Sequence, residues 1–314
     1  MKKTILTTIL VIWGVTSNIT SQNKNITINF KRNSDNSVDF NYDKKLPGSF
    51  YLSIKFNNLQ NCNRSNYKGI IKHNSGRLLK LKPLRQEQPI NFSYKYSYTR
   101  GIPNPKIDSL FTYSLPLKKG KKITILESSN LNEKFFGSER PSKWKSYVIN
   151  RTQADTICSM RKGIVVKIIN DFKTDTLVKY DYKSQMNSIL IEHSDGTFAS
   201  YKGFKRNSFF VKLGQTVYPQ TQLGFLDILN NKTYRLYFNI HYLISKDLKI
   251  KKNETLKKQK SRNEFLTPYF TTTNGIQQLK NTSGYIINFN EKILLQEFTK
   301  KEKKKYKKNP EIFN

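Results

Sequence analysis

The chain contains few of the residues that most often bind metal ions or form covalent cross-links. Its 314 residues include two cysteines and three histidines, His73, His193 and His241. Two thiols exclude a small fold built on disulfides and a zinc site made of four thiolates. Three histidines leave little room for imidazole-based metal chemistry.

Glycine, proline and acidic residues are also scarce. Fourteen glycines and ten prolines exclude a collagen-like or low-complexity chain. The hydrophobic fraction of 36% is too high for a disordered chain and is enough for one large core or two ordinary ones. With 22 acidic residues against 56 Lys and Arg, the formal net charge is +34. A lysine-rich composition explains this charge as well as an anionic partner does.

Long hydrophobic runs are missing, and the one short run lies at the N-terminus. Lys2 and Lys3 precede residues 5–15 (ILTTILVIWGV), and a polar segment of small residues ends near Ser21. This order is typical of a secretory signal peptide, whereas an uncleaved anchor would need a longer apolar segment. We therefore expect residues 1–21 to be removed. The mature protein is then expected to be exported to the periplasm or cell envelope of a bacterium and to be soluble there.

Export changes the interpretation of the positive charge. Outside the cytoplasm the available polyanions are cell-wall polymers and lipid headgroups. The sequence also lacks an interleaved basic and aromatic RNA-binding signature and a DNA-reading helix. We expect no nucleic-acid partner.

Residues 22–128 have the pattern of short strands. Ile26, Ile28 and Phe30 alternate with polar residues, and similar runs are separated by turn sequences such as Pro47-Gly48. This spacing predicts an antiparallel β-sandwich, followed by a connector at 129–150.

A second strand-rich block covers residues 151–246, and a basic extension covers 247–314. Within the extension, residues 290–308 (NEKILLQEFTKKEKKKYKK) predict a helix. Its lysines either complement the helix dipole or bind anionic envelope polymers. The expected fold class is therefore mainly β, with two β-domains and a C-terminal basic helix.

The second block carries an ordered series of motifs. ADTICSMRKGIVVKI comes first, followed by ILIEHSDGTFASYKGF, FVKLGQTVYPQTQLGF and YRLYFNIHYL. Together they resemble the lysostaphin/LytM-type zinc metalloendopeptidases, which cut peptidoglycan and have the duplicated hybrid motif β-fold. In this resemblance Asp195-Gly196 forms a tight hairpin turn, and Gly163, Gly214 and Gly224 permit turns in the β-domain.

The positions that the resemblance assigns to catalysis hold unsuitable residues. In the family, a His-x-x-x-Asp pair and the second histidine of His-x-His bind zinc, while Tyr-x-His and the first histidine of His-x-His supply the catalytic histidines. Trp144 and Val148 occupy the first pair, Gly203 the Tyr-x-His position, and Arg235 and Tyr237 the final two. A permanent cation such as Arg235 cannot coordinate a metal. The resemblance therefore implies a degenerate member without metal or cofactor.

The remaining histidines and cysteines do not suggest another active site. We expect His193 to pack in the core and His73 to lie at the surface, and we expect His241 to share a strand face with Arg235 and Tyr237. Cys62 and Cys158 fall in different predicted domains. They are either two separate thiols or a disulfide between the domains.

These considerations predict a non-catalytic relative that binds peptidoglycan or a cell-wall hydrolase in its groove. The guanidinium would bind carboxylates and the phenol rings would contact sugar or peptide faces. The candidate contacts are Tyr201, Lys202, Arg235, Tyr237 and Asn239. One alternative is an active metal-dependent peptidoglycan endopeptidase, which would require zinc. Another is an envelope-assembly or surface protein whose β-sandwich binds protein.

Overall fold

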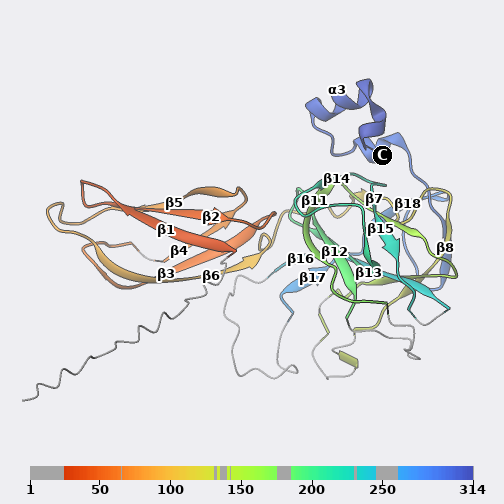
Figure 1. Ribbon diagram of the computed structural model, residues 1–314, viewed down its shortest axis with the longest axis horizontal. Helices are drawn as coiled ribbons and strands as arrows, with labels where there is room; N and C mark the ends of the chain where they lie inside the picture. Colours follow the sequence, from red (N-terminus) through yellow and green to blue (C-terminus); the bar gives the residue numbers. More distant parts are fainter. Residues whose placement is uncertain are drawn as a thin grey trace, which may run out of the picture.

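The computed structural model describes residues 25–64, 66–130, 133–134, 140–141, 143–174, 185–229, 232–244 and 261–313. The predicted signal peptide lies outside these residues. Strands dominate the described chain, which confirms the mainly β class (Figure 1). Among the described helices, none has the length and apolar character needed to cross a membrane.

The N-terminal domain is a sandwich of two three-stranded antiparallel sheets. One sheet has the order β1 (Ile26–Arg32), β2 (Val38–Lys44), β5 (Ser75–Leu81), and the other β4 (Tyr67–Ile71), β3 (Phe50–Gln60), β6 (Asn91–Arg100). Every second residue of β2 faces the core, as the alternation predicts. The hydroxyls of Tyr94 and Tyr96, on β6, link the two sheets by donating to backbone carbonyls of β1, each at 3.0 Å.

The C-terminal domain is built around an 11-stranded sheet. Its main path runs β14 (Thr216–Val217), β11 (Gly163–Ile169), β12 (Asn187–Glu192), β13 (Phe198–Phe209), β16 (Tyr234–Leu243), β9 (Tyr147–Arg151), β8 (Lys122–Glu127), β20 (Ser283–Ile286). Three strands attach beside this path: β10 (Thr156–Cys158), β15 (Gln222–Leu226) and β17 (Asn263–Phe265). A small second sheet of this domain has the order β19 (Gly275–Gln278), β18 (Tyr269–Thr272), β7 (Thr112–Tyr113).

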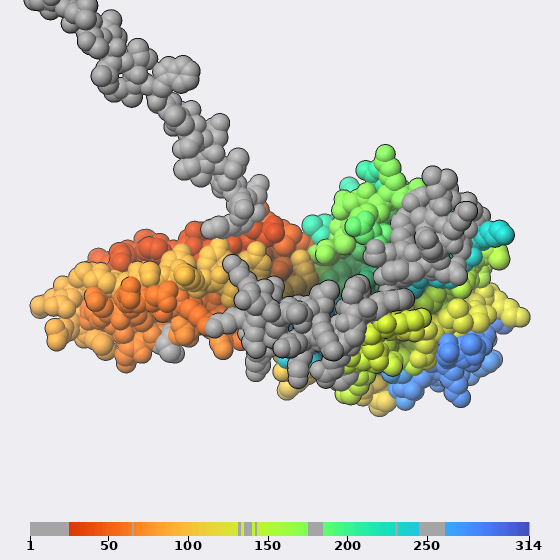
Figure 2. Space-filling model, turned by 90° about the horizontal axis from the view of Figure 1, so that it is seen from below, coloured from red at the N-terminus to blue at the C-terminus, as the bar shows by residue number. Residues whose placement is uncertain are grey.

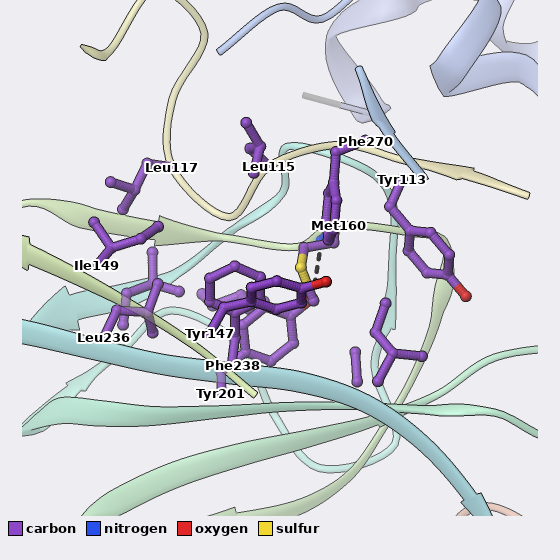
Figure 3. Packing of buried hydrophobic residues seen from close by; sticks show 14 of the residues in the cluster. Tyr113, Leu115, Leu117, Tyr147, Ile149, Met160, Tyr201, Leu236, Phe238 and Phe270 are labelled. Atoms are coloured by element: carbon purple, nitrogen blue, oxygen red, sulfur yellow. Dashed lines mark hydrogen bonds between the residues drawn. The ribbon is translucent and has the colours of Figure 1, made fainter. Parts of the chain in front are cut away.

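Aromatic side chains fill the core of this domain (Figure 3). Tyr147 of β9 stacks on Phe238 of β16, with ring centroids 5.2 Å apart, and Phe270 of β18 meets both rings edge-on. The Tyr201 hydroxyl accepts a hydrogen bond from the backbone N–H of Met160 at 2.9 Å. This bond satisfies the polar end of a completely buried ring, which is what a buried tyrosine requires.

The division between the domains differs from the expected one. Phe111, Leu115 and Ile123, assigned above to the sandwich of residues 22–128, lie in the core of the second domain. Strand β9 begins inside the expected connector 129–150, and β17 to β20 come from the expected extension. Alternation identifies buried residues but does not identify the sheet against which they pack, so the boundary could not be read from it.

The helix predicted over 290–308 is interrupted, so that prediction is corrected. It consists of α2 (Glu291–Leu295) and α3 (Lys300–Lys308), followed by the 3-10 helix η2 (Pro310–Phe313). Thr299 caps α3 in a capping box with Glu302, which starts a new helix at that point. Leu294, Phe298 and Phe313 pack with Tyr218 and attach these helices to the β-domain.

A buried arginine joins the C-terminal helices to the sheet. Arg161 donates two hydrogen bonds to Glu297, at 2.9 and 2.8 Å, and one to Asp195 at 2.7 Å. A fourth goes to the Tyr113 hydroxyl at 3.0 Å, and the guanidinium carbon lies 3.7 Å from the centroid of the Phe111 ring. Asp195 belongs to the predicted hairpin turn, where it also accepts from the backbone N–H of Thr197 at 2.9 Å. We call these groups the Arg161 cluster.

The two domains meet through a second buried charge. The Glu192 carboxylate, on β12, accepts hydrogen bonds from the backbone N–H (2.8 Å) and the hydroxyl of Ser49 in the sandwich. The backbone N–H of Asn104 donates to the carbonyl of Leu243 at 2.8 Å. The sandwich therefore packs against the end of the central strands, and Figure 2 shows the two domains in one continuous surface.

Replacement of Arg161 by methionine should destabilise the β-domain strongly. The change leaves the Glu297 and Asp195 carboxylates without their buried cation, which typically costs about 3–5 kcal/mol. Arg140→Met is a matched control, because Arg140 forms an exposed ion pair in which its Nε lies 3.8 Å from Oε2 of Glu133. That variant should lose about 0–1 kcal/mol. Guanidinium unfolding compares them, and similar losses would contradict the role of the Arg161 cluster.

Acidification should loosen the docking of α3 through Glu302. Burial opposes ionisation, but hydrogen bonds from Lys162, Thr299 and Tyr218 outweigh it and lower the pKa of Glu302 from 4.5 to about 2. The stabilisation is complete above pH 4.5 and is lost as the pH falls through 2, a change of at most about 3 kcal/mol.

Glu302→Gln should remove this pH-dependent difference. Unfolding measured at pH 5.5 and pH 2.5 should show wild type more stable than the variant at the higher pH, and about three quarters of that difference should be lost at the lower pH. A constant difference between the two proteins at both pH values would contradict the assignment.

Candidate functional site

The outer face of β16 carries a row of polar side chains. Leu236, Phe238 and Ile240 point into the core, so the residues between them lie on the opposite face and are half-buried. These residues are Arg235, Tyr237, Asn239 and His241. The expectation that His241 shares a face with Arg235 and Tyr237 is confirmed.

The register of the neighbouring strands completes this face. Lys202 of β13 lies opposite Tyr237 on one side, and Val148 of β9 lies opposite Tyr237 on the other. The flanking pairs are Ser200 with Asn239 and Asn150 with Arg235. We define the polar face as Val148, Asn150, Ser200, Lys202, Arg235, Tyr237 and Asn239.

Hydrogen bonds orient several of these side chains. The Arg235 Nε–H donates to Asn150 Oδ1 at 2.7 Å, and an Nη1–H of Arg235 donates to the Tyr237 hydroxyl at 3.4 Å. Asn239 Oδ1 lies 3.0 Å from His241 Nδ1. The guanidinium of Arg235 is therefore held in one orientation next to the Tyr237 phenol.

The polar face is positively charged. None of its seven residues is acidic, and two of them, Lys202 and Arg235, are cations. The Lys202 side chain is exposed. Desolvation by the surrounding protein atoms nevertheless lowers its pKa, and the charge of the neighbouring Lys167 lowers it further. Burial also lowers the pKa of His241, with a smaller contribution from Lys202. Lys202 and Arg235 together give the polar face a net positive charge, which attracts an anion.

Two of the predicted site positions lie elsewhere. Tyr201 is 0% exposed and faces the core, so its interpretation as a groove contact is wrong. The Trp144 ring packs against Phe265 with centroids 4.5 Å apart, and its indole N–H donates to the Ser128 carbonyl at 2.8 Å. The other candidates, Lys202, Arg235, Tyr237 and Asn239, come together on the polar face.

Gly203 explains why the Tyr-x-His position cannot hold a histidine here. The pairing of β12 with β13 shifts by one residue between Asn187 and Ser188, and Gly203 takes φ +109° at this irregularity. A Cβ at residue 203 would lie 2.1 Å from the Arg235 carbonyl oxygen. The close approach of β16 excludes any side chain, and Lys202 is the residue that faces Tyr237.

Asn150 and Ser200 are members of the polar face that sequence reasoning missed. Each lies two residues from a position that was considered, Val148 or Lys202. A period of two along β9 and β13 was the available signal.

The polar face does not fit a zinc ion. Val148 has no donor atom, Lys202 and Arg235 are cations, and Tyr237 would have to ionise before it could bind a metal. Across the residues that the structure describes, no group of three or more His, Cys, Asp or Glu side chains is arranged to hold a metal.

The other histidines and the cysteines take structural positions. His193 is buried with Nδ1 2.8 Å from the Lys162 carbonyl, as expected for a packing residue, and His73 is exposed. Cys62 and Cys158 are both free thiols, so the disulfide alternative is not realised. Burial raises the pKa of Cys158 to about 12, which leaves it a protonated, unreactive thiol.

Comparison with known proteins gives only distant similarities. No protein-family model matches the chain, and no curated protein matches it. Among the similar solved structures are one described as a peptidase M23 from Pseudomonas aeruginosa (TM-score 0.28, 11% identity, 60% of this chain and 82% of that one) and a zinc-containing peptidase from Vibrio cholerae (TM-score 0.24, 10% identity, 68% of this chain and 74% of that one). Both TM-scores are below 0.5.

Gly203→Ala should test the close approach of β13 and β16. The substitution places a Cβ against the Arg235 carbonyl and also strains a positive φ, which together should cost more than about 3 kcal/mol. Gly275→Ala is the matched control because Gly275 has φ +97° and nothing within 4 Å of its Cβ position. It should cost only about 1 kcal/mol. Urea unfolding measures both, and an equal cost would contradict the proposed backbone contact.

Proposed function

We propose that this chain is an exported, non-catalytic, peptidase-like protein of the cell envelope. In this proposal the polar face binds the stem peptides of peptidoglycan, and a cell-wall hydrolase is the alternative ligand. The observation that carries the proposal is the row of Lys202, Tyr237 and Arg235 across three neighbouring positions of β13 and β16.

The chemistry of this row suits a peptide that carries carboxylates. A guanidinium presents a planar fork that matches a carboxylate, and Asn150 already fixes the orientation of Arg235. Lys202 adds a second positive charge, and the Tyr237 ring offers an apolar face with a hydroxyl at its edge. Stem peptides combine carboxylates with amide groups, so they can use all three side chains.

The same row supports a binding role without hydrolysis. The sequence resemblance assigns Val148 and Tyr237 to metal-ligand positions of the zinc endopeptidases, and the two residues are direct neighbours on β9 and β16. The side chains at this point of the polar face are the aliphatic Val148, the phenol of Tyr237 and the cations Lys202 and Arg235. An attacking water would have neither a metal nor a general base among these side chains.

Arg235→Gln should weaken binding to purified peptidoglycan sacculi by at least about tenfold. The variant removes a charge-assisted hydrogen bond to a carboxylate, typically about 1.5–3 kcal/mol. Arg85→Gln, an exposed position in the sandwich, changes the net charge equally and should bind as wild type. Co-sedimentation with sacculi measures both. Equal binding by the two variants would contradict the use of the polar face. Retention of purified wall hydrolases in place of sacculi would identify the alternative ligand.

The purified chain should contain no stoichiometric zinc and should leave peptidoglycan uncut. Elemental analysis measures the metal, and a zymogram on peptidoglycan measures cutting. Bound zinc together with clearing of the zymogram would establish the active endopeptidase instead.

One observation favours protein binding by the sandwich as a second candidate function. Strands β4 and β5 are each an edge strand of one of the two sheets, and between them lies a cleft of about 490 Å³ lined by Tyr42, Tyr67 and Ile70. Such edges can accept an extended peptide as an additional strand. If the cleft binds protein, the full chain should capture an envelope protein in a pull-down, and Ile70→Lys should abolish this capture. Capture unaffected by that change would exclude the cleft.

A further inference from the structure

Helix α3 presents a dense array of positive charge. Its nine residues include one acidic side chain, Glu302, which is turned toward the β-domain and accepts hydrogen bonds from Lys162 at 2.7 Å and from the Tyr218 hydroxyl at 2.9 Å. The remaining charged residues of the helix are exposed lysines: Lys300, Lys301, Lys303, Lys304, Lys305, Lys307 and Lys308. The charge that α3 directs to solvent is therefore entirely positive.

This array is held together against its own repulsion. Lysines spaced three and four residues apart on a helix repel each other, and a helix of nine residues is too short to be stable alone. The capping box at Thr299 and the bonds to Glu302 fix its start. Tyr306 fixes its second half by packing against Phe298 and Phe313, with ring centroids 5.9 and 6.0 Å away. The lysines are thus displayed by a preformed element rather than by an unfolded tail.

The shape of this region suits a flat ligand. Helix α3 projects from one side of the β-domain near the end of the chain (Figure 1). Ile312 of η2, directly after the helix, is 62% exposed. A projecting helix can reach a planar surface with its exposed lysines and the apolar side chain beside them. A linear polymer, in contrast, would be held better in a groove.

We propose that α3 and η2 form a docking site for the surface of an anionic lipid bilayer. Phosphate headgroups would neutralise the lysines and relieve their mutual repulsion, while Ile312 contacts the interface between headgroups and acyl chains. This site is independent of the polar face and would place the β-domain at a membrane surface.

Vesicle co-sedimentation of the full chain tests this proposal. Vesicles of phosphatidylcholine alone set the baseline, and vesicles with 30% phosphatidylglycerol test the dependence on charge. Binding to the second kind should be at least about tenfold stronger and should fall steeply as salt rises. Replacing Lys301, Lys304, Lys305 and Lys308 by glutamine keeps helix propensity and should abolish this gain.

The matched control removes the same charge elsewhere. Glutamine at Lys31, Lys55, Lys68 and Lys95, all exposed in the sandwich, should leave the gain within about twofold of wild type. Far-ultraviolet circular dichroism verifies that both variants fold. An equal loss in the two variants, or no gain for wild type, would overturn the site. Binding to soluble polyphosphate but not to vesicles would overturn the lipid assignment in favour of an anionic polymer.

Discussion

The pairing of β16 with β13 on one side and β9 on the other is the constraint on which the site depends. This pairing turns Phe238 into the core against Tyr147 and turns Tyr237 outward between Lys202 and Val148. The carbonyl of Arg235 then comes so close to residue 203 that only glycine fits. The same backbone contacts that close the core therefore determine which side chains form the polar face.

Two buried charges hold this sheet relative to the rest of the molecule. The Arg161 cluster joins the β12–β13 hairpin to the C-terminal helices, and Glu192 joins β12 to the sandwich through Ser49. A buried ion is tolerated only where hydrogen bonds and opposite charges compensate for lost water. Arg161 has the carboxylates of Glu297 and Asp195 as partners. Glu192 has the hydrogen bonds from Ser49 and the nearby positive charges of Lys44 and Arg100. The β12–β13 hairpin is therefore joined both to the C-terminal helices and to the sandwich.

Local patterns allowed much of the fold to be predicted. The Asp195-Gly196 turn was predictable because its geometry depends on adjacent residues, and Gly196 has the positive φ (+88°) that such a turn requires. The outward face of β16 followed from its alternation. The interruption at Thr299 also had a local signal, since Thr299 and Glu302 have the spacing of a capping box, but the prediction of one continuous helix passed over it.

Features that depend on distant contacts could not be predicted in this way. Tyr201 and Lys202 are consecutive, so only one of them can lie on the polar face, and the packing of Ala199 and Tyr201 into the core decides which. The C-terminal boundary of the sandwich was misplaced because the alternation of apolar and polar residues in 111–126 is compatible with either domain. The choice between sheets is made by tertiary packing.

The central claim is that the polar face binds wall peptides and leaves them intact. The most direct test is titration of isotopically labelled protein with soluble muropeptides, following amide chemical shifts by nuclear magnetic resonance and peptide mass in the same samples. The account predicts shifts concentrated at Lys202, Arg235, Tyr237 and their strand neighbours, with no change in peptide mass. Shifts confined to other surfaces, or the appearance of cleaved peptide, would contradict it.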